Sequence, residues 1–100
     1  MDELRFEWDD DKDALNQARH QVSFEEARTV FFDPHGLVID DPDHSITEVR
    51  FIIVGHSRVF RLLVVAHCYR QADTVIRIIS ARKATTHESK TYQAGGRRGR

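Results

Sequence analysis

Three runs rich in β-branched and apolar residues follow one another in the second half of the chain. They cover residues 47–55, 58–69 and 74–83, and only residues 56–57 and about 70–73 separate them. β-branched and aromatic residues favour extended backbone, so each run predicts a β-strand. Links this short cannot hold the crossover that parallel strands need. We therefore expect the three strands to form an antiparallel meander.

The first part of the chain predicts a short strand and a helix. Residues 4–8 alternate apolar and polar side chains, which is the pattern of a strand with one buried face. The aspartates at residues 9–11 supply an N-cap for a helix over residues 11–19. The buried side of that helix is expected to be its apolar side, and a polar stripe near it is expected to be solvated. The expected buried residues are Ala14, Leu15 and Ala18, and the stripe is Lys12, Asn16 and His20.

Two further helices are predicted. Ser23 and Glu26 match the S-x-x-E capping box at the start of a helix over residues 24–32. Apolar residues at helical spacing on this segment indicate a core-facing side, made of Phe24, Ala27, Val30 and Phe31. Residues 85–93 are polar and compatible with a short C-terminal helix that carries Glu88 and Tyr92.

The order of these elements predicts an α+β fold. In it, the N-terminal strand and two helices pack on one face of a three- to five-stranded antiparallel sheet, followed by the short C-terminal helix. Residues 37–39 are a possible extra strand, so the strand number stays open. One hundred residues are enough for one domain, predicted over residues 1–94. Residues 95–100, G-G-R-R-G-R, are expected to be a disordered basic tail.

Charge is divided unequally along the chain. Residues 1–50 hold 14 acidic and 5 basic side chains, whereas residues 51–100 hold 2 acidic and 10 basic ones. This asymmetry is typical of a protein whose basic half binds a polyanion, although the halves can also neutralise each other in the fold. No run of 18 apolar residues and no apolar leader occur, so we expect no membrane contact. The single cysteine, Cys68, is expected in the core of a cytoplasmic protein.

The predicted hairpins place several cations on one open face of the sheet. A two-residue loop at residues 56–57 sets Ile52 opposite Arg61, and a three-residue loop at 71–73 sets His67 opposite Arg77. The open face then holds Arg50, Arg61, His67 and Arg77. A four-residue second loop would instead point Arg77 into the core, where an unpaired charge is costly. Strand alternation places Arg82 on the helix-covered face, unless the strand twists or ends before it.

Arginines and a histidine on an open face suit a phosphodiester substrate. Guanidinium groups bind phosphate, and an imidazole moves protons near neutral pH. RNA supplies its own nucleophile, the 2′-hydroxyl, so neither a metal nor another cofactor is expected. Lys12, His20, Glu88 or Tyr92 could contribute from the flanking elements. An arginine-rich face that only binds, or an edge strand with a solvated Arg77, remains the alternative.

Signals for other chemistry are weaker. The histidines are scattered and show no zinc-ligand spacing. Residues 40–44, D-D-P-D-H, have metal-binding side chains, but we interpret them as an acidic surface loop. The sequence contains no phosphate-binding GxxxxGK[ST] loop, no GxGxxG and no GxSxG motif.

Several segments together resemble the BrnT family of bacterial toxins. They are F-E-W-D at 6–9, V-S-F-E-E-A at 22–27, V-F-F-D-P at 30–34, L-L-V-V at 62–65 and R-I-I-S-A-R-K-A at 77–84. Single positions that fit the same pattern are Lys12, Asn16, His20, Arg50, Gly55, Glu88 and Tyr92. The resemblance runs from about residue 5 to residue 92.

This resemblance implies a small ribonuclease with a fold similar to the RelE toxins. It implies a type II toxin–antitoxin pair, in which a BrnA-type antitoxin neutralises the toxin. The antitoxin would carry the DNA-binding part, so that the complex represses its own operon and touches operator DNA only through the antitoxin. RNA cleavage would then stop translation and growth.

Site residues follow from both lines of reasoning. Family positions carried over are Lys12, His20, Arg50, Arg77, Arg82, Glu88 and Tyr92, whereas His67 and Arg61 come from the strand register. We expect Arg77 and Arg82 to hold the phosphate and His67, Lys12 or Tyr92 to transfer protons. RNA contacts are expected from Arg50, Arg61, His20 and Glu88. A non-catalytic module that binds RNA or the antitoxin, and a purely structural interaction domain, are the alternatives.

Overall fold

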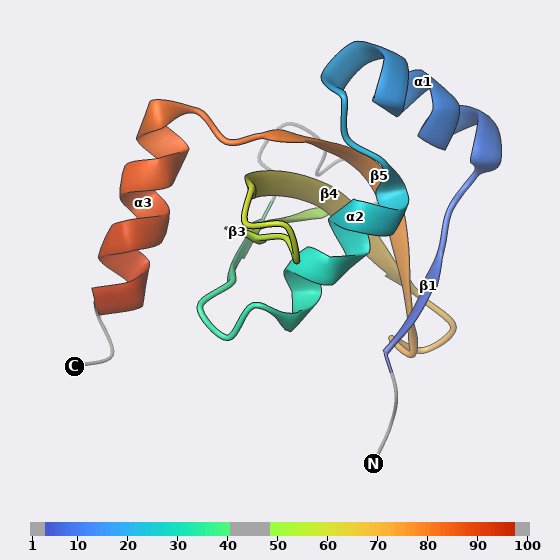
Figure 1. Cartoon of the computed structure of the whole chain (residues 1–100). Coiled ribbons are helices and arrows are strands. Elements are labelled where there is room, and N and C mark those ends of the chain that lie inside the picture. The colour runs from blue at the N-terminus through green and yellow to red at the C-terminus, as the bar shows by residue number, and fades with distance from the viewer. Residues whose placement is uncertain (1–3, 41–48, 98–100) are drawn as a thin grey trace.

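The described part of the chain, residues 4–40 and 49–97, forms one mixed β-sheet with helices on both faces in the computed structural model (Figure 1). Within these ranges the sheet has five strands in the order β1-β5-β4-β3-β2. The strands are β1 (Arg5–Glu7), β2 (Leu37–Asp40), β3 (Phe51–His56), β4 (Leu62–Arg70) and β5 (Val75–Lys83). The helices are α1 (Asp10–His20), α2 (Phe24–Thr29), the 3-10 turn η1 (Val30–Phe32) and α3 (Thr86–Arg97).

One strand pair departs from the predicted antiparallel sheet. β2, β3, β4 and β5 pair antiparallel in a meander, as the short links require. However, β1 pairs parallel with β5, from Arg5 opposite Val75 to Glu7 opposite Arg77. β1 is free to do so because α1 and α2 carry the chain away from it, so no short hairpin dictates its direction. The prediction of an α+β fold is confirmed, and the prediction of a wholly antiparallel sheet is wrong.

Helices cover both faces of the sheet rather than one. Ile53, Leu63 and Val65 pack with residues of α2 and η1 in the larger core cluster. Their neighbours Val54 and Val64 point to the opposite face, where they pack against Tyr92 of α3. α3 therefore lies across the sheet from α1 and α2 (Figure 1). It also continues to Arg97, so the boundary predicted at residue 94 falls inside this helix, and residues 98–100 lie outside the described residues.

The buried side of α1 is the polar side, contrary to the prediction. Asn16 is only 6% exposed, whereas Ala14, Leu15 and Ala18 are all exposed. The Asn16 amide nitrogen donates to the carbonyls of Val22 and Ala81, both at 2.8 Å, and its oxygen accepts from the Ala81 N–H at 3.1 Å. One buried amide thus ties α1 to β5 and to the start of α2. The apolar periodicity of α1 pointed to the wrong side because these hydrogen bonds outweigh the burial of two alanines and one leucine.

The hairpin between β3 and β4 has a longer loop than predicted. Gly55 pairs with Leu63 and His56 with Leu62, so residues 57–61 form the loop. This register differs from the predicted one by an odd number of residues, which turns every β4 side chain to the other face. His67 therefore points under the helices, where it is 0% exposed, instead of lying on the open face. Cys68 is buried, in agreement with its predicted place in the core.

A β-bulge in the next hairpin decides where the two arginines of β5 point. His67 pairs with Ile78 but Ala66 pairs with Ser80, so Ile79 is an extra residue on β5. Arg77 then lies opposite Cys68, and Arg82 lies opposite Val64, both on the α3 face. Arg77 was predicted on the sheet face away from α1 and α2, and this placement is correct. The residue predicted opposite it on β4, His67, is wrong, because Cys68 takes that place. The placement of Arg82 on the helix-covered face is wrong because strict alternation ignores the bulge.

His67 makes stability dependent on pH. Its Nδ1 lies 3.2 Å from the Val65 carbonyl, while Nε2 has no hydrogen-bond partner among the described residues. The rings of Phe31, Phe51 and Tyr69 surround it. Burial lowers the pKa of His67, and the hydrogen bond to Val65 offsets this only in part. The folded protein therefore holds a neutral imidazole at a pH where the unfolded chain binds a proton.

We expect the free energy of unfolding to decrease as the pH falls below about 6.5, the ordinary value for histidine. The loss is at most about 1.4 kcal/mol per pH unit for one group. Urea denaturation of the protein and of His67→Phe between pH 7.5 and 5.5 measures this. The phenylalanine variant should lose most of the pH dependence in this window. An unchanged slope in the variant would assign the effect to other groups.

Candidate active site

A fixed carboxylate lies where η1 meets the end of β3. Asp33 Oδ2 accepts hydrogen bonds from the His56 backbone N–H at 2.8 Å and from the Tyr92 hydroxyl at 2.7 Å. Asp33 Oδ1 accepts from the His35 backbone N–H at 2.9 Å. Residues from η1, β3 and α3 therefore meet at one side chain, although up to 59 positions separate them in the sequence.

The hydrogen bonds at this carboxylate orient the His56 imidazole. His56 Nδ1 lies 3.1 Å from the Tyr92 hydroxyl oxygen, and the two rings meet edge to face with centroids 5.1 Å apart. Because the Tyr92 hydroxyl donates to Asp33, its oxygen is left to accept a hydrogen bond from the N–H of His56 Nδ1. This tautomer leaves Nε2 with a free lone pair. The His56 side chain is 45% exposed, so a substrate can reach Nε2.

The protonation states of the other two residues support this arrangement. Burial, followed by the hydrogen bond to Asp33, raises the pKa of Tyr92 to about 12. Burial also favours the neutral form of Asp33, but hydrogen bonds from His56, His35 and Tyr92 outweigh it and lower the Asp33 pKa. At neutral pH Tyr92 is therefore a hydroxyl and Asp33 a carboxylate. Tyr92 is suited to holding His56 in place rather than to transferring protons.

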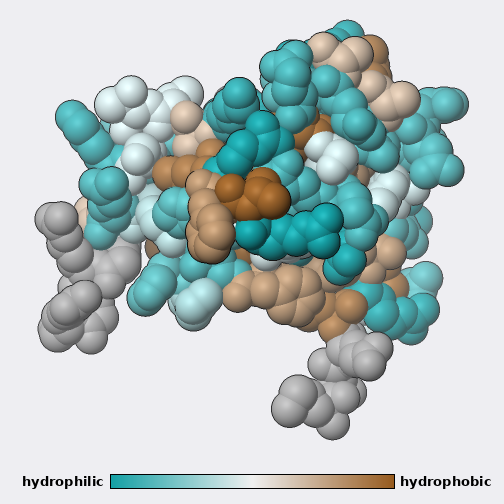
Figure 2. All heavy atoms as spheres, viewed as in Figure 1, coloured by the Kyte–Doolittle hydropathy of each residue, from teal (hydrophilic) through white to brown (hydrophobic). Residues whose placement is uncertain are grey.

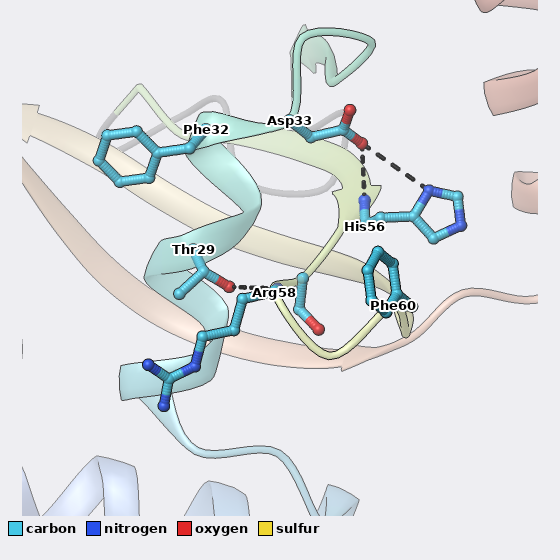
Figure 3. A pocket seen from close by; sticks show the side chains of 7 residues that line it. Thr29, Phe32, Asp33, His56, Arg58 and Phe60 are labelled. Carbon is cyan, nitrogen blue, oxygen red and sulfur yellow. Dashed lines mark hydrogen bonds and ion pairs between the residues drawn. The ribbon is translucent and has the colours of Figure 1, made fainter.

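A pocket of about 420 Å³ opens beside His56 (Figure 3). It is lined by Thr29, Phe32, Asp33, His56, Ser57, Arg58 and Phe60. The Arg58 backbone N–H donates to Thr29 Oγ1 at 2.9 Å, which fixes the base of the arginine. Its side chain is exposed, and within the described residues its guanidinium makes no hydrogen bond or ion pair. The pocket therefore combines an accessible imidazole with an arginine available for an anion.

Arg61, expected on the open face, instead anchors the β3–β4 loop. Its guanidinium pairs with Glu26 of α2 and donates to the Gln21 carbonyl at 3.0 Å. The hydrogen bond from Arg61 lowers the pKa of Glu26 despite partial burial, so this pair is charged at neutral pH. The capping box is confirmed in its first half, because Ser23 Oγ accepts from the Glu26 N–H at 3.0 Å.

Arg82 and Glu88 lie at the same end of the sheet as the site and fix the start of α3. Arg82 binds the Glu88 carboxylate through two hydrogen bonds of 2.8 Å. This bidentate pair lowers the pKa of Glu88 to about 2. Glu88 also accepts from the Thr85 N–H at 2.9 Å, and Thr85 Oγ1 accepts from the Glu88 N–H at 3.2 Å. Tyr92 follows Glu88 by one helical turn, so this cluster determines where its hydroxyl lies.

The other predicted residues are not part of this group. Arg77 pairs with Glu7 at 2.8 Å near the opposite end of the sheet. On β4, Arg77 lies opposite Cys68, and His56 lies opposite Leu62. These two β4 residues are six positions apart, so roughly 20 Å of strand separates Arg77 from His56. Arg50 directly precedes β3 at that same distant end. Lys12 and His20 lie on α1, across the sheet from α3, and His67 is buried beneath the helices.

Three residues of the site were missed by the sequence reasoning. Asp33 was assigned to the end of a helix and His56 to a hairpin turn, while Arg58 was assigned to a strand. The available signals were the family segment at 30–34, which contains Asp33, and the single family position Gly55. Gly55 marks the place where the Asp33 side chain lies against β3, but nothing in the spacing connects it to His56.

Gly55 leaves room for the Asp33 carboxylate. A Cβ at this position would lie 3.1 Å from Asp33 Oδ2 and 3.0 Å from Val30 Cγ1, both tighter than ordinary contacts. Asp33 Oδ2 cannot move away without lengthening its hydrogen bonds to His56 and Tyr92. We therefore expect Gly55→Ala to lower catalytic activity by roughly tenfold or more through misplacement of His56. Activity should be compared with Gly95→Ala, where the added Cβ would crowd Leu37 and no atom of Asp33. Full activity in Gly55→Ala would contradict the assigned role of Asp33.

Comparison with known proteins identifies the family. The sequence model for "Ribonuclease toxin, BrnT, of type II toxin-antitoxin system" matches residues 8–88. The chain belongs to the BrnT family. Members of this family are ribonuclease toxins of type II toxin–antitoxin systems. The matched region of BrnT includes Asp33, His56 and Arg58 and ends four residues before Tyr92.

A solved structure is similar to this BrnT-family chain. The 1.1 Å crystal structure of the Brucella abortus ribonuclease toxin BrnT is 17% identical in sequence and superposes with a TM-score of 0.64. The match covers 84% of this chain and 100% of the Brucella protein, and it confirms the fold. No match was found among curated proteins.

Two further observations concern metals and membranes. In residues 4–40 and 49–97, no cluster of three or more His, Cys, Asp or Glu side chains is arranged to hold a metal ion. The acidic segment at residues 41–44 lies outside the described residues. No helix in the described ranges is long and apolar enough to cross a membrane.

Proposed function

We propose that this chain is an endoribonuclease that cleaves RNA by metal-independent acid–base chemistry at His56. The observation that carries the proposal is the hydrogen-bonded series from Asp33 through Tyr92 to His56 Nδ1, which leaves the Nε2 lone pair free at a pocket that Arg58 also lines. An oriented imidazole and an arginine that line one pocket suit attack of a ribose hydroxyl on phosphorus.

In this reaction His56 Nε2 accepts the proton of the 2′-hydroxyl as the 2′-oxygen attacks the adjacent phosphorus. The bond from phosphorus to the 5′-oxygen breaks, and that oxygen takes up a proton from solvent. The products are a 2′,3′-cyclic phosphate and a 5′-hydroxyl end. Arg58 binds the non-bridging phosphate oxygens, on which negative charge increases in the transition state.

The sequence-predicted residues take modified roles in this proposal. Tyr92 and Asp33 position His56, and Arg82 with Glu88 holds α3 so that Tyr92 reaches it. Arg61 supports the loop that carries Arg58. The remaining predicted residues lie away from the pocket, and we assign them contacts with RNA beyond the cleaved bond. They are Arg77, Arg50, Lys12 and His20. His67 has a structural role, because its ring is buried.

The wider biology of the family extends the proposal. We propose that a BrnA-type antitoxin neutralises this chain in a hetero-oligomer and that the complex binds operator DNA only through the antitoxin. The cellular target is messenger RNA in the cytoplasm, so cleavage inhibits translation and growth. We also propose that the chain is similar to the RelE toxins, which cleave RNA with a small α+β fold.

The purified chain should cleave a single-stranded RNA oligonucleotide in the presence of EDTA, leaving 2′,3′-cyclic phosphate ends. The same oligonucleotide with 2′-deoxyribose at the cleaved position should stay intact, because the nucleophile is absent. Product analysis by mass spectrometry checks both results. Cleavage of the deoxy-substituted oligonucleotide would exclude 2′-hydroxyl attack. RNA that stays intact, together with harmless overexpression, would favour the non-catalytic binding module.

A further inference from the structure

Phe60 is an exposed aromatic residue in an unusual backbone conformation. Its side chain is 85% exposed, and its φ angle is 66°. Residues with bulky side chains rarely adopt this left-handed region, and an exposed phenylalanine loses contact with the core. Local conformational preference and burial therefore both disfavour a phenylalanine at this position.

The surrounding loop nevertheless holds Phe60 in this position. The Phe60 N–H donates to the Ser57 carbonyl, and the Ser57 N–H donates to the Arg61 carbonyl, both at 2.9 Å. Ser57 is itself buried and donates from Oγ to Glu26 Oε2 at 2.7 Å, next to the Arg61–Glu26 pair. The β3–β4 loop is thus tied to α2 at both ends. It presents the ring of Phe60 to solvent on a rigid support.

A second exposed aromatic residue lies across the same pocket. Phe32, at the end of η1, is 59% exposed and lines the pocket together with Phe60. In Figure 3 the Phe32 ring lies on the side of Asp33, whereas the Phe60 ring lies next to His56. Figure 2 shows apolar atoms at the β3–β4 loop ringed by hydrophilic ones. This apolar surface is therefore bordered by the residues assigned to phosphate binding and proton transfer.

We propose that Phe60 and Phe32 stack the nucleobases on either side of the cleaved phosphate, so that the substrate is unpaired RNA. The inference rests on the proposed ribonuclease function and specifies its substrate. Unstacked bases of single strands pack on aromatic side chains, while Arg58 contacts the phosphate between them. Bases inside a duplex are already stacked on each other and cannot reach the two rings. The aromatic faces accept any base, so the selection is for strandedness more than for sequence.

The test uses an RNA oligonucleotide that carries 2-aminopurine and is 2′-O-methylated throughout, so that it binds without being cleaved. Stacking on Phe60 should quench 2-aminopurine fluorescence in the single strand, and the matching duplex should bind at least tenfold more weakly. Phe60→Asn keeps a residue that tolerates the left-handed backbone but removes the ring. We expect it to raise the Kd of the single strand by roughly 5- to 100-fold. Phe60→Trp should restore affinity, and Val59→Ala, an exposed neighbour, should change nothing.

The two proposals fail in distinguishable ways. Quenching and the Phe60→Asn effect without cleavage of unmodified RNA would support stacking and remove the ribonuclease function. Stacking would be overturned if the wild-type chain cleaved duplex and single-stranded RNA equally well. It would also be overturned if the wild-type chain cleaved RNA and Phe60→Asn bound the single strand with unchanged affinity. Stacking would also be overturned if Phe60→Asn kept its RNA affinity but stayed toxic when the cognate antitoxin is co-expressed. Phe60 would then be a contact for the antitoxin.

Discussion

Replacing His56 with alanine is expected to lower the rate of RNA cleavage by roughly 10²- to 10⁴-fold. The imidazole is the only group of the pocket whose free nitrogen lone pair is both oriented by a hydrogen bond and accessible to substrate. Its side chain is 45% exposed, so its loss should leave the fold intact. Single-turnover cleavage of a defined RNA, with circular dichroism as a check of folding, measures the effect.

A matched control and a second variant sharpen this result. His87→Ala removes an exposed histidine from the first turn of α3 and should leave the cleavage rate unchanged. Tyr92→Phe removes the hydroxyl that lies between Asp33 and His56 Nδ1. We expect it to lower the rate less than His56→Ala and to alter the pH profile of cleavage, because the tautomer of His56 is no longer selected. Wild-type activity in His56→Ala would refute the proposed general base.

The largest effect on stability is expected from Asn16→Ala. Its side-chain amide satisfies two carbonyls and one N–H in the interior, those of Val22 and Ala81. Removal leaves these three buried groups without partners, at about 1–3 kcal/mol each. The free energy of unfolding should therefore fall by about 3–9 kcal/mol, which is comparable with the 5–15 kcal/mol typical of a whole domain. Thermal and urea denaturation of purified protein measure the loss.

Gln17→Ala is the control for Asn16→Ala on the same helix. Gln17 is exposed, and its side chain donates only to the half-buried Asp13 carboxylate, at 3.1 Å. Its replacement should change stability by less than about 0.5 kcal/mol. If the Asn16 variant were as stable as the Gln17 variant, α1 would be held to β5 by packing alone. A variant that fails to fold at all would agree with the upper end of the expected range.

Much of the secondary structure was predictable because it depends on local preferences. The three β-rich runs, the aspartate N-cap of α1 and the Ser23 cap of α2 appear in the structure close to where they were expected. The family resemblance was also readable, since it rests on segments of contiguous residues. Tyr92 was identified as a site residue in this way, and the structure places it in the candidate active site.

The faces of the strands were not predictable to the same degree. Loop length sets the register, and an error of an odd number of residues reverses every side chain. The five-residue loop at 57–61 is closed by the contacts of Ser57 and Arg61 with Glu26, which lies 31 and 35 residues earlier in the chain. For Arg77, the errors in the β3–β4 and β4–β5 registers cancelled, so its predicted face is correct. For His67, only the β3–β4 error applies, so its predicted face is wrong. The bulge at Ile79, which turns Arg82 toward α3, has no signature in a strand of uninterrupted β-formers.

The sequence by itself determined which segments become strands and helices, the α+β class and membership of the BrnT family. These properties depend on residue preferences and patterns that extend over a few neighbours. Only the tertiary structure decided that Asn16 faces inward, that β1 runs parallel to β5, and that Asp33, Tyr92 and His56 meet beside Arg58. Each of these contacts joins groups far apart in the chain, and its energy exists only once the register of the sheet has brought them within hydrogen-bonding distance.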